Sequence, residues 1–556
     1  MGRTRPAVTR ARPRRRPSAD RSTGLRIAVL AVPAAFATIF FVLPVGSILV
    51  RGLGSATGDR VQEVLTGQSF AGIVWFSIWQ AVASTILTML VALPAAYVLA
   101  RYDIVGRRVF RALLVVPFVL PTVVVAGAFE AVFTRFGLDD GALTLRHTPW
   151  AILLAHVFFN YAVVVRIVAT FWGQLDPRPE EAARVLGASR ATALLQVTLP
   201  RLRPALGSAA AIVFLFSFTS FGVILLLGGP GIATVETEIW RYAVSRTEFD
   251  VAAALALLQL LAVVLLVVLT TRTEANRTVD AATAADRSLR VPQGRQWLLV
   301  AGVITTALLL LGIPVATLVE RSLATGDGYG VANFTALGDQ VNLLPASAAK
   351  ALTNSLFYAA IAATIAVVIG GLAALATGGG GRFGSLLDIG LTLPLGTSAV
   401  TLGLGILIGL DEPPLDFRTR WWIVPVAHSL VGIPFVLRGV VPALRGVAPQ
   451  LREAAATLGA TPRQVTREVD LPLAARALVV GAAFAFAVSL GEFGATSFVP
   501  RRPETITAPI AIFRLLGQPG DILRGQAMAL SVILMAVTAI SALLIERFSG
   551  TNRGLL

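Results

Sequence analysis

Long apolar stretches alternate with short polar segments along almost the whole chain. Each stretch holds about 20 mostly hydrophobic residues, the length that a helix needs to cross a bilayer. Hydrophobic residues make up 55% of the 556 residues and charged residues only 14%, whereas roughly a quarter of a soluble protein is charged. The pattern predicts an all-α polytopic membrane protein with about twelve transmembrane helices, near residues 27–50, 72–99, 111–133, 150–171, 204–227, 250–271, 297–319, 352–376, 385–410, 421–440, 477–499 and 526–545.

One polar segment occurs twice. Residues 181–200 and 453–472 share Glu-Ala-Ala, three residues, Gly and a final Leu-Pro, and a constant shift of 272 residues relates the two copies. The same shift carries Phe221 onto Phe493. Six predicted spans fall in each copy, so both copies insert the same way round. The sequence therefore predicts two parallel six-helix repeats at 27–271 and 297–545, a disordered arm at 1–26, a cytoplasmic linker at 272–296 and a cytoplasmic tail at 546–556.

The repeated segment predicts two short helices joined at a glycine. Asp176, Pro177 and Pro179 favour a helix start before Glu181, and Gly187 can take the left-handed conformation that ends it. The alanines after Glu181 leave a narrow side beside one carboxylate. Such a ridge suits docking into a groove on another protein.

Charge sets the expected orientation. The net charge is +16, and the arginines gather in the short segments on one side of the predicted spans, as the positive-inside rule requires. Both repeated segments and both termini are then cytoplasmic. The nine arginines of the first 26 residues predict contact with anionic lipid, and no nucleic-acid partner is expected.

Some chemistries are excluded by composition. The chain has no cysteine, so disulfides, Cys-ligated zinc and iron–sulfur clusters are absent. Lys350 is the single lysine, and it does not follow a glycine-rich turn as a phosphate-binding loop requires. Any ATPase must therefore be a partner, and the chain itself is predicted not to be an enzyme.

At this point the pattern resembles a known signature. Glu-Ala-Ala, three residues, Gly, nine residues and a hydrophobic-x-Leu-Pro ending resemble the membrane-spanning component of binding-protein-dependent ABC importers, which has the type I importer permease fold. The resemblance implies a coupling helix that docks on the ATPase subunit. Carried over by position, the coupling residues are Glu181, Ala182, Ala183, Gly187, Leu199 and Pro200, with Glu453, Ala454, Ala455, Gly459, Leu471 and Pro472.

The resemblance also implies the partners and the location. They are two copies of an ABC ATPase, which hold ATP and Mg²⁺, an extracytoplasmic substrate-binding protein and the bacterial cytoplasmic membrane; this chain would bind no cofactor. A fused double copy is similar to the thiamine and ferric-iron importer permeases. The stretches AILLAHVFFNYAVVVR and SLGEFGATSF look most like the thiamine branch, although SLGEFG also occurs in the iron branch. Thiamine is therefore expected ahead of ferric iron, and both cargoes are cationic.

Polar residues inside the predicted spans are functional candidates. Glu492 lies deep in the eleventh span, and the first copy has Ser220 at its position; both are candidates for the transport pathway, although Glu492 could instead hydrogen-bond within the bundle. Glu130 is expected to reach toward the membrane surface. His156 and His428 are expected to be packing residues. Pro117, Pro121 and Pro394 are expected to break spans three and nine.

Two other functions fit parts of the sequence. An ion-coupled secondary transporter also has twelve spans in two parallel halves, but it needs intramembrane carboxylate relays and no paired docking segment. A membrane enzyme would need His, Asp and Glu at catalytic spacing, and no such cluster is found in the sequence.

Overall fold

Helices form almost all of the described structure. The computed structural model describes residues 29–140, 143–275, 289–326, 328–377, 382–499 and 502–549, so the arm, the middle of the linker and most of the tail lie outside the described residues. Within them the only strands are the short pair β1 (Ala324–Thr325) and β2 (Gly328–Tyr329). Ten helices are long and apolar enough to cross a membrane, or up to twelve if each of two bent pairs is one span. The predicted all-α membrane fold is confirmed.

The two copies repeat one helical arrangement. In the first, α4 (Gln68–Arg101), α7 (Pro149–Gln174) and α10 (Leu199–Phe218) pack together around a core rich in alanine and valine. In the second, the corresponding three helices pack in the same way, α17 (Ala348–Thr377), α20 (Ile423–Arg445) and α23 (Leu471–Gly491). Small side chains let these helices approach closely, as is usual in membranes.

Spans three and nine are broken, as predicted, but of the three prolines only Pro121 stands at a break, whereas Pro117 and Pro394 lie inside the helices that precede the breaks. α5 (Arg107–Val119) meets α6 (Thr122–Phe136) at 103°, and α18 (Arg382–Gly396) meets α19 (Ala399–Gly409) at 102°. Pro121 stands between the first two helices, where its fixed φ favours a new helix start. Each bend turns its second helix across the bundle toward the other copy.

The two copies interlock through these bent helices. α2 (Leu43–Gly54) of the first copy packs on α19 of the second, and α15 (Ile313–Leu323) of the second packs on α6 of the first. The remaining spans at this interface are α13 (Phe249–Ala275) and α25 (Asp521–Ser549). The copies are therefore joined by crossing helices on both sides of the pseudo-twofold axis.

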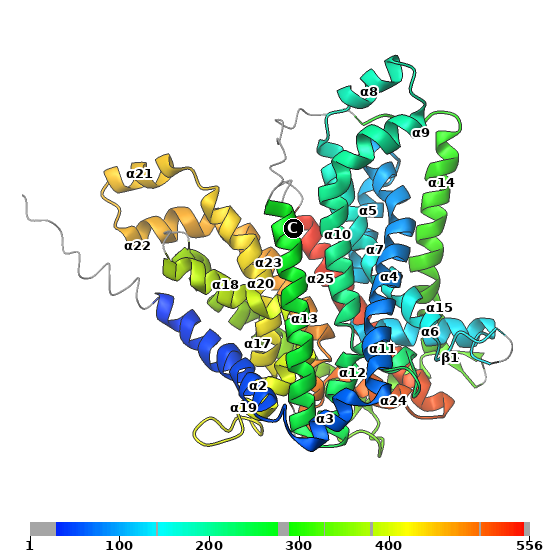
Figure 1. Cartoon of the computed structure of the whole chain (residues 1–556), viewed down its shortest axis with the longest axis vertical. Coiled ribbons are helices and arrows are strands. Elements are labelled where there is room, and N and C mark those ends of the chain that lie inside the picture. Colours follow the sequence, from blue (N-terminus) through cyan, green and yellow to red (C-terminus); the bar gives the residue numbers. More distant parts are fainter. Residues whose placement is uncertain are drawn as a thin grey trace, which may run out of the picture.

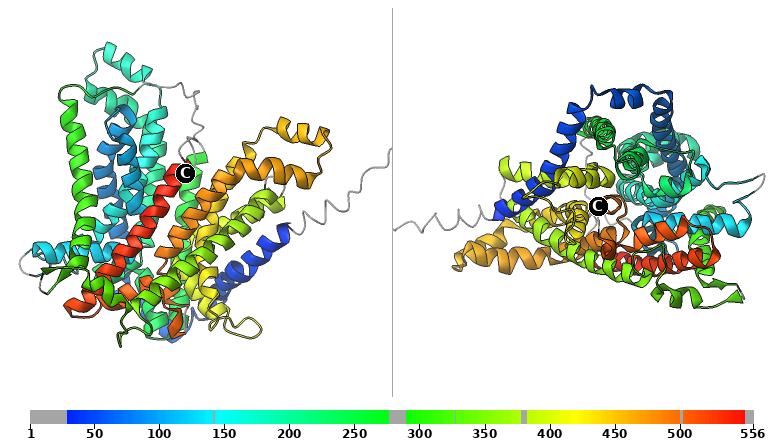
Figure 2. Two further views of the ribbon diagram at one scale, coloured as in Figure 1. Left: turned by 180° about the vertical axis from the view of Figure 1, so that it is seen from behind. Right: turned by 90° about the horizontal axis from the view of Figure 1, so that it is seen from below.

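Figure 1 and the left view of Figure 2 place the two repeated segments at the same end of the molecule. We call this the hairpin end; the axial end is the opposite one, which holds the short helices α3 (Asp59–Thr66), α12 (Val235–Trp240) and α24 (Ala508–Leu516). The hairpins stand on separate arms, whereas the copies converge toward the axial end (Figure 1). The repeats are thus parallel, as predicted.

The limits predicted for spans five and eleven are wrong. The helices run over Arg190–Phe218 and Pro462–Gly491. Each helix begins well before the start of its predicted span and ends well before the end of that span. The prediction began these two spans only after Pro200 and Pro472. Instead, π-helical turns at Leu194–Thr198 and Thr466–Asp470 precede these prolines, and the wider turn accommodates a residue without an N–H group.

The crossing of α2 and α19 gives a test of this interface. A Cβ at Gly405 would lie 3.0 Å from both Cβ and O of Pro44, whereas a Cβ at Gly46 would meet nothing within 4 Å. We expect Gly405→Ala to lower the free energy of unfolding by about 1–3 kcal/mol through overpacking. Gly46→Ala on α2 should be neutral or stabilising by up to about 1 kcal/mol. Thermal unfolding of the purified protein in detergent measures both, and equal unfolding temperatures for the two variants would contradict the crossing.

Candidate functional site

Each repeated segment forms a helical hairpin. In the first, α8 (Arg178–Val185) is followed by α9 (Arg190–Ala193), and Gly187 between them has φ +96°. The N–H of Ala188 donates to the Ala183 carbonyl at 3.0 Å, which is the Schellman arrangement of a helix end. In the second, α21 (Pro449–Thr457) and α22 (Pro462–Val465) flank a glycine with φ +87°, Gly459. The predicted turn at a left-handed glycine is confirmed. The second short helix is not separate as predicted, because α9 and α22 continue through the π-helical turns into the long helices Arg190–Phe218 and Pro462–Gly491.

The hairpin tips expose apolar side chains outside the bundle. Leu186 and its counterpart Leu458 are 88% and 89% exposed. The sequence reasoning overlooked them, although both precede the repeated glycine and recur under the 272-residue shift. Of the coupling candidates, the glutamates, first alanines and glycines are exposed, and the second alanines are half-buried. The Leu-Pro pairs lie apart from the tips, at the start of α10 and α23.

The two hairpins are held to the bundle by opposite charges. In the first copy, Arg101 at the end of α4 pairs with Glu180, and the hydroxyl of Thr198 donates to the same carboxylate at 3.0 Å. In the second copy, the counterparts of Glu180 and Thr198 are Arg452 and Asp470, which pair with each other at 2.8 Å. The same two positions are used in both copies. The acidic residue and the hydroxyl of the first copy are replaced by a basic and an acidic residue in the second.

The linker contacts only the first hairpin among the described residues. Arg290 extends beside the end of α4: its N–H donates to the Arg101 carbonyl at 3.2 Å, and its carbonyl accepts from Asp103 N–H at 3.0 Å. Its guanidinium pairs with Glu181 at 2.9 Å. In the part of the chain that the structure describes, no ion pair reaches Glu453, the counterpart of Glu181. The two hairpins are therefore not equivalent.

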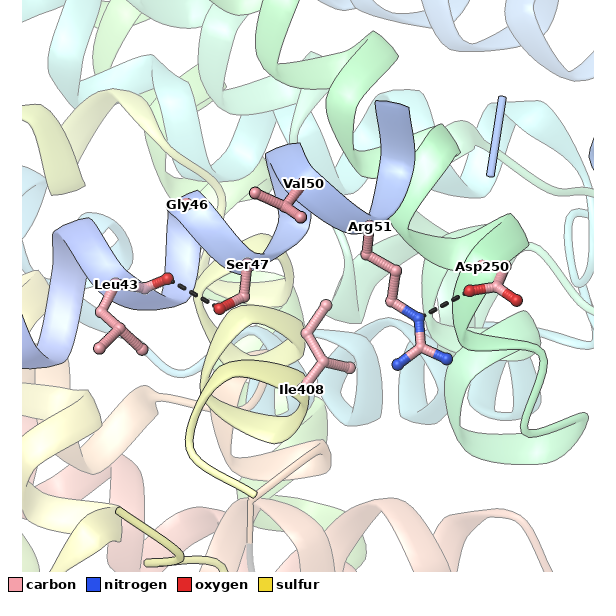
Figure 3. A pocket seen from close by; sticks show the side chains of 7 residues that line it. All are labelled: Leu43, Gly46, Ser47, Val50, Arg51, Asp250 and Ile408. Atoms are coloured by element: carbon pink, nitrogen blue, oxygen red, sulfur yellow. Dashed lines mark hydrogen bonds and ion pairs between the residues drawn. The ribbon is translucent and has the colours of Figure 1, made fainter. Parts of the chain in front are cut away.

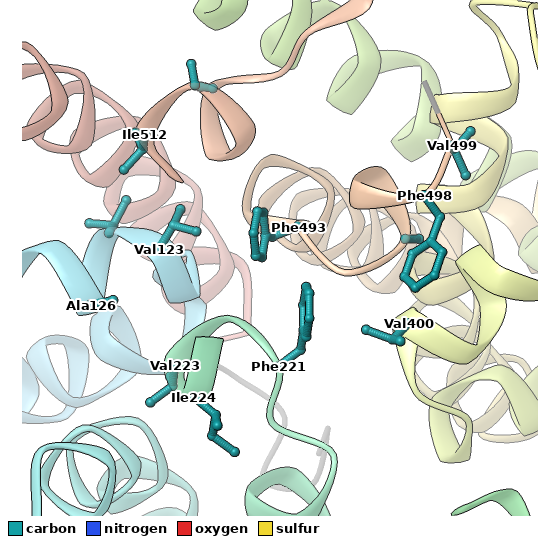
Figure 4. Close-up of a cluster of buried hydrophobic side chains, with 14 of the residues drawn as sticks. Val123, Ala126, Phe221, Val223, Ile224, Val400, Phe493, Phe498, Val499 and Ile512 are labelled. Carbon is teal, nitrogen blue, oxygen red and sulfur yellow. The ribbon is translucent and has the colours of Figure 1, made fainter. Parts of the chain in front are cut away.

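Equivalent residues of the two copies meet toward the axial end. Phe221 and Phe493 stack with ring centroids 5.3 Å apart and an interplanar angle of 21° (Figure 4). Two residues related by a pseudo-twofold axis can touch each other only where that axis passes. The glycines that follow them are tightly packed: a Cβ at Gly222 would lie 2.4 Å from the Thr122 hydroxyl, and one at Gly494 would lie 3.0 Å from Cβ of Ala399. The starts of the bent helices α6 and α19 thus support the stacked pair.

Glu492 lies just past the end of α23, not within the span as predicted. Its carboxylate accepts from the N–H groups of Ala495 at 2.8 Å and Thr496 at 2.9 Å, and from the Thr496 hydroxyl at 2.6 Å. It is 6% exposed. A buried carboxylate needs such donors, and here it caps the short turn that follows. Its pathway role stays a prediction, while its contacts in this conformation are structural.

His428 extends this network. Ser489 Oγ lies 2.8 Å from its Nδ1 and Thr496 Oγ1 lies 2.7 Å from its Nε2. The Thr496 hydroxyl donates to Glu492, and Nε2 of His428 also lies 3.4 Å from that carboxylate, so a proton on Nε2 has an acceptor in either group. Ser489, His428, Thr496 and Glu492 therefore form one continuous relay of hydrogen bonds.

The first copy lacks this relay. His156 is buried, and its Nδ1 lies 2.9 Å from Ser84 Oγ. Its Nε2 is buried and has no partner among the described residues, because Ile224 stands where the second copy has Thr496. Ser220, the counterpart of Glu492, is half-buried in the break after α10.

A second buried carboxylate joins the copies. Glu236 of α12 accepts hydrogen bonds from Ser398, the cap of α19, and from Gln259 of α13. Burial raises the pKa of Glu236 to about 7, and the two hydrogen bonds act in the opposite direction. The sequence reasoning missed this residue because it lies between two predicted spans, where an acidic side chain is ordinary.

Two further features lie away from the hairpins and the stack. Glu130 pairs with Arg146 at 3.1 Å instead of reaching alone toward the membrane surface as expected. A groove of about 660 Å³ is lined by Leu43, Gly46, Ser47, Val50, Arg51, Asp250 and Ile408 (Figure 3). None of the predicted site residues lines this groove. Among the described residues, no group of three His, Asp or Glu side chains could hold a metal ion.

The family model for the binding-protein-dependent transport system inner membrane component matches residues 92–275 and 366–550. The chain belongs to this family. It carries the family domain twice, and it is a transport component rather than an enzyme. The family works with an ATPase and a binding protein in a bacterial inner membrane, so the ion-coupled secondary transporter and the membrane enzyme are set aside.

Related proteins match either most of the chain or about one copy of the repeat. The thiamine transport system permease protein of Brucella abortus is 27% identical over 485 residues, which cover 84% of this chain and 86% of that relative. A probable ABC transporter permease protein of Sinorhizobium fredii is 25% identical over 80% of this chain and 82% of its own length. A putative 2-aminoethylphosphonate transport system permease protein of Salmonella paratyphi A is 32% identical over 46% of this chain and 96% of its length. The fused permease is thus about two single-copy relatives long.

The contacts of Glu492 predict its effect on stability. Glu492→Gln places an amide NH₂ where the carboxylate now accepts from donors, so one donor loses its acceptor. We expect a loss of about 1–3 kcal/mol in the free energy of unfolding. Ser220→Ala, at the equivalent position, is the control and should unfold like the wild type. Both are measured by thermal unfolding in detergent. A Gln variant that unfolds like the wild type but loses transport would favour the pathway role over the structural one.

Proposed function

We propose that this permease subunit moves thiamine from an extracytoplasmic binding protein into the cytoplasm, driven by two ATPase subunits that dock on its two hairpins. The observation that carries the proposal is the pair of equivalent hairpins at one end of the molecule, each with a nearly fully exposed leucine at its tip.

The tips suit a protein partner. Exposed leucines are common on lipid-facing helices, but Leu186 and Leu458 stand on short polar helices beyond the bundle. A helix tip with one large apolar residue beside alanines fits a groove on a partner protein. Two such tips, one per copy, call for two ATPase protomers, and the ATP and Mg²⁺ belong to them.

Charge supports the orientation. Arginines of the hairpins and of the linker gather at the hairpin end, where Arg184, Arg190 and Arg290 lie. By the positive-inside rule this end faces the cytoplasm. The binding protein then meets the axial end, and both termini are cytoplasmic.

The conformation fits an importer open toward its ATPases. The copies meet at the stacked phenylalanines, while the arms that carry the hairpins stand apart (Figure 1). Nucleotide-driven approach of the ATPases would bring the hairpins together and part the copies at the axial end.

Thiamine is favoured as the cargo for two reasons. The thiamine permease aligns along most of this chain, whereas the aminoethylphosphonate permease aligns with one copy only. The axis is also lined by aromatic rings, which attract a flat cation. Ferric iron is the next candidate.

Both parts of the proposal are tested in liposomes that hold the complete transporter, with loaded binding protein outside and ATP inside. The wild type should import thiamine in preference to ferric iron or 2-aminoethylphosphonate. Leu186→Asp and Leu458→Asp should each reduce uptake at least about tenfold, because a charge replaces the apolar contact, and they should weaken co-purification of the ATPase.

The matched control is Val185→Thr, since Val185 is also exposed and its counterpart in the second copy is Thr457. This variant should transport normally. Normal uptake by both aspartate variants would contradict docking at the tips, and uptake of another cargo in place of thiamine would contradict the cargo assignment.

A further inference from the structure

Four aromatic side chains close a ring at the pseudo-twofold axis. Beside the stacked Phe221–Phe493 pair, Phe221 contacts Trp240 at 6.1 Å between centroids, Phe493 contacts Phe513 at 5.3 Å, and Trp240 contacts Phe513 at 6.3 Å. Each ring therefore touches two others. We call these four residues the aromatic quartet.

The quartet obeys the internal symmetry. Phe221 and Phe493 are related by the 272-residue shift. Trp240 and Phe513 are each the sixth residue after the threonine that precedes their helix, Thr234 for α12 and Thr507 for α24. The residue that follows each threonine donates its N–H to a serine of span two or eight: Val235 donates to Ser77, and Ala508 donates to Ser355. The quartet is thus two symmetry-related pairs, contributed equally by the two copies.

The quartet seals the axis by contacts between its own rings. Phe221 is 6% and Phe493 is 3% exposed, and the ring faces cover each other. When the copies part at the axial end, each ring loses its partner across the axis. An apolar surface exposed in this way costs free energy unless another flat group covers it.

Two buried acidic residues are close in sequence to members of the quartet. Glu492 directly precedes Phe493 in the sequence, and Glu236 lies one helical turn before Trp240. Among the described residues, neither pairs with an arginine. Trp240 Nε1 is also shielded from solvent and donates to no acceptor in the described part of the chain. It is free to donate to a passing ligand.

We propose that the aromatic quartet is both the gate of the transport path and a transit site for a flat cationic ring, which slips between Phe221 and Phe493 as they part. A ring between two others needs a separation of about 7 Å, two van der Waals spacings. The inserted ring restores the stacking that each phenylalanine loses, and its charge is attracted by the ring faces. A hydrated metal ion gains no stacking there. The inference rests on the proposed cargo and adds its place of passage.

The test removes one ring while keeping an apolar side chain of similar volume. Phe493→Leu in the complete transporter should lower thiamine uptake about tenfold, the loss expected when a stacked cation contact is removed. Phe493→Tyr and Phe493→Trp keep an aromatic face and should retain most of the uptake. The control is Phe484→Leu, which removes a ring of α23 that stacks on Phe435 of α20 with centroids 5.7 Å apart, in a hydrophobic cluster separate from that of Phe493. It should transport normally.

Structural damage is separated by measuring thermal unfolding, where Phe493→Leu and Phe484→Leu should shift alike. If the wild type imports thiamine and Phe493→Leu does so at the same rate, the transit site is wrong and the proposed function stands. The transit site is also wrong if Tyr and Trp rescue no better than Leu. If the wild type imports no thiamine, the cargo proposal fails, and the transit site for its ring fails with it.

Discussion

The contact between the two copies across the pseudo-twofold axis is the constraint on which the rest of the structure depends. Phe221 stacks on Phe493 because the internal repeat brings equivalent residues to one point. Beside this stacked pair, α2 crosses α19 and holds the copies together. Pro44 of α2 packs so closely on Gly405 of α19 that a larger residue would not fit there. With the copies joined near one end, their free movement is largest at the other, where the hairpins lie. A fold that closes at one end while its arms stand apart at the other suits a transporter that exposes its path to one side at a time.

Fusion lets the two copies differ where a homodimer could not. The anchors of the hairpins have exchanged charges, Glu180 with Arg101 in one copy and Arg452 with Asp470 in the other. The linker adds Arg290 to the first hairpin alone among the described contacts. Near the axis, the second copy has the hydrogen-bond relay that ends at Glu492. The differences preserve the shape of each hairpin while changing what holds it, so both tips remain available to the same kind of partner.

Much of this architecture follows from the sequence, because its signals are local or repeated. Span lengths, the repeat and the breaks near Pro121 and Pro394 follow from hydropathy and from the fixed geometry of proline. The left-handed Gly187 follows from its place between two helical runs. The continuation of helices through Pro200 could not be predicted, because it depends on a π-helical turn whose hydrogen bonds are set by packing. The quartet was also out of reach, since aromatic residues within apolar segments have no periodicity that marks a shared axis. Glu492 was placed inside a span because hydropathy does not show that the helix ends at Gly491. The backbone N–H groups that bind its carboxylate are available only because the helix ends there.

The most direct test of this account is a pair of distances in the complete transporter. The chain has no cysteine, so spin labels can be attached at introduced cysteines without background. One pair of equivalent, exposed positions is Arg203 and Ala475 on α10 and α23, toward the hairpin end. The other is Gly231 and Glu504, each three residues before the equivalent Thr234 and Thr507, toward the axial end. Trapping the ATPases with nucleotide should shorten the first distance and lengthen the second. If both distances change in the same direction, or if neither changes while ATP is hydrolysed, the copies do not pivot about the axial contact.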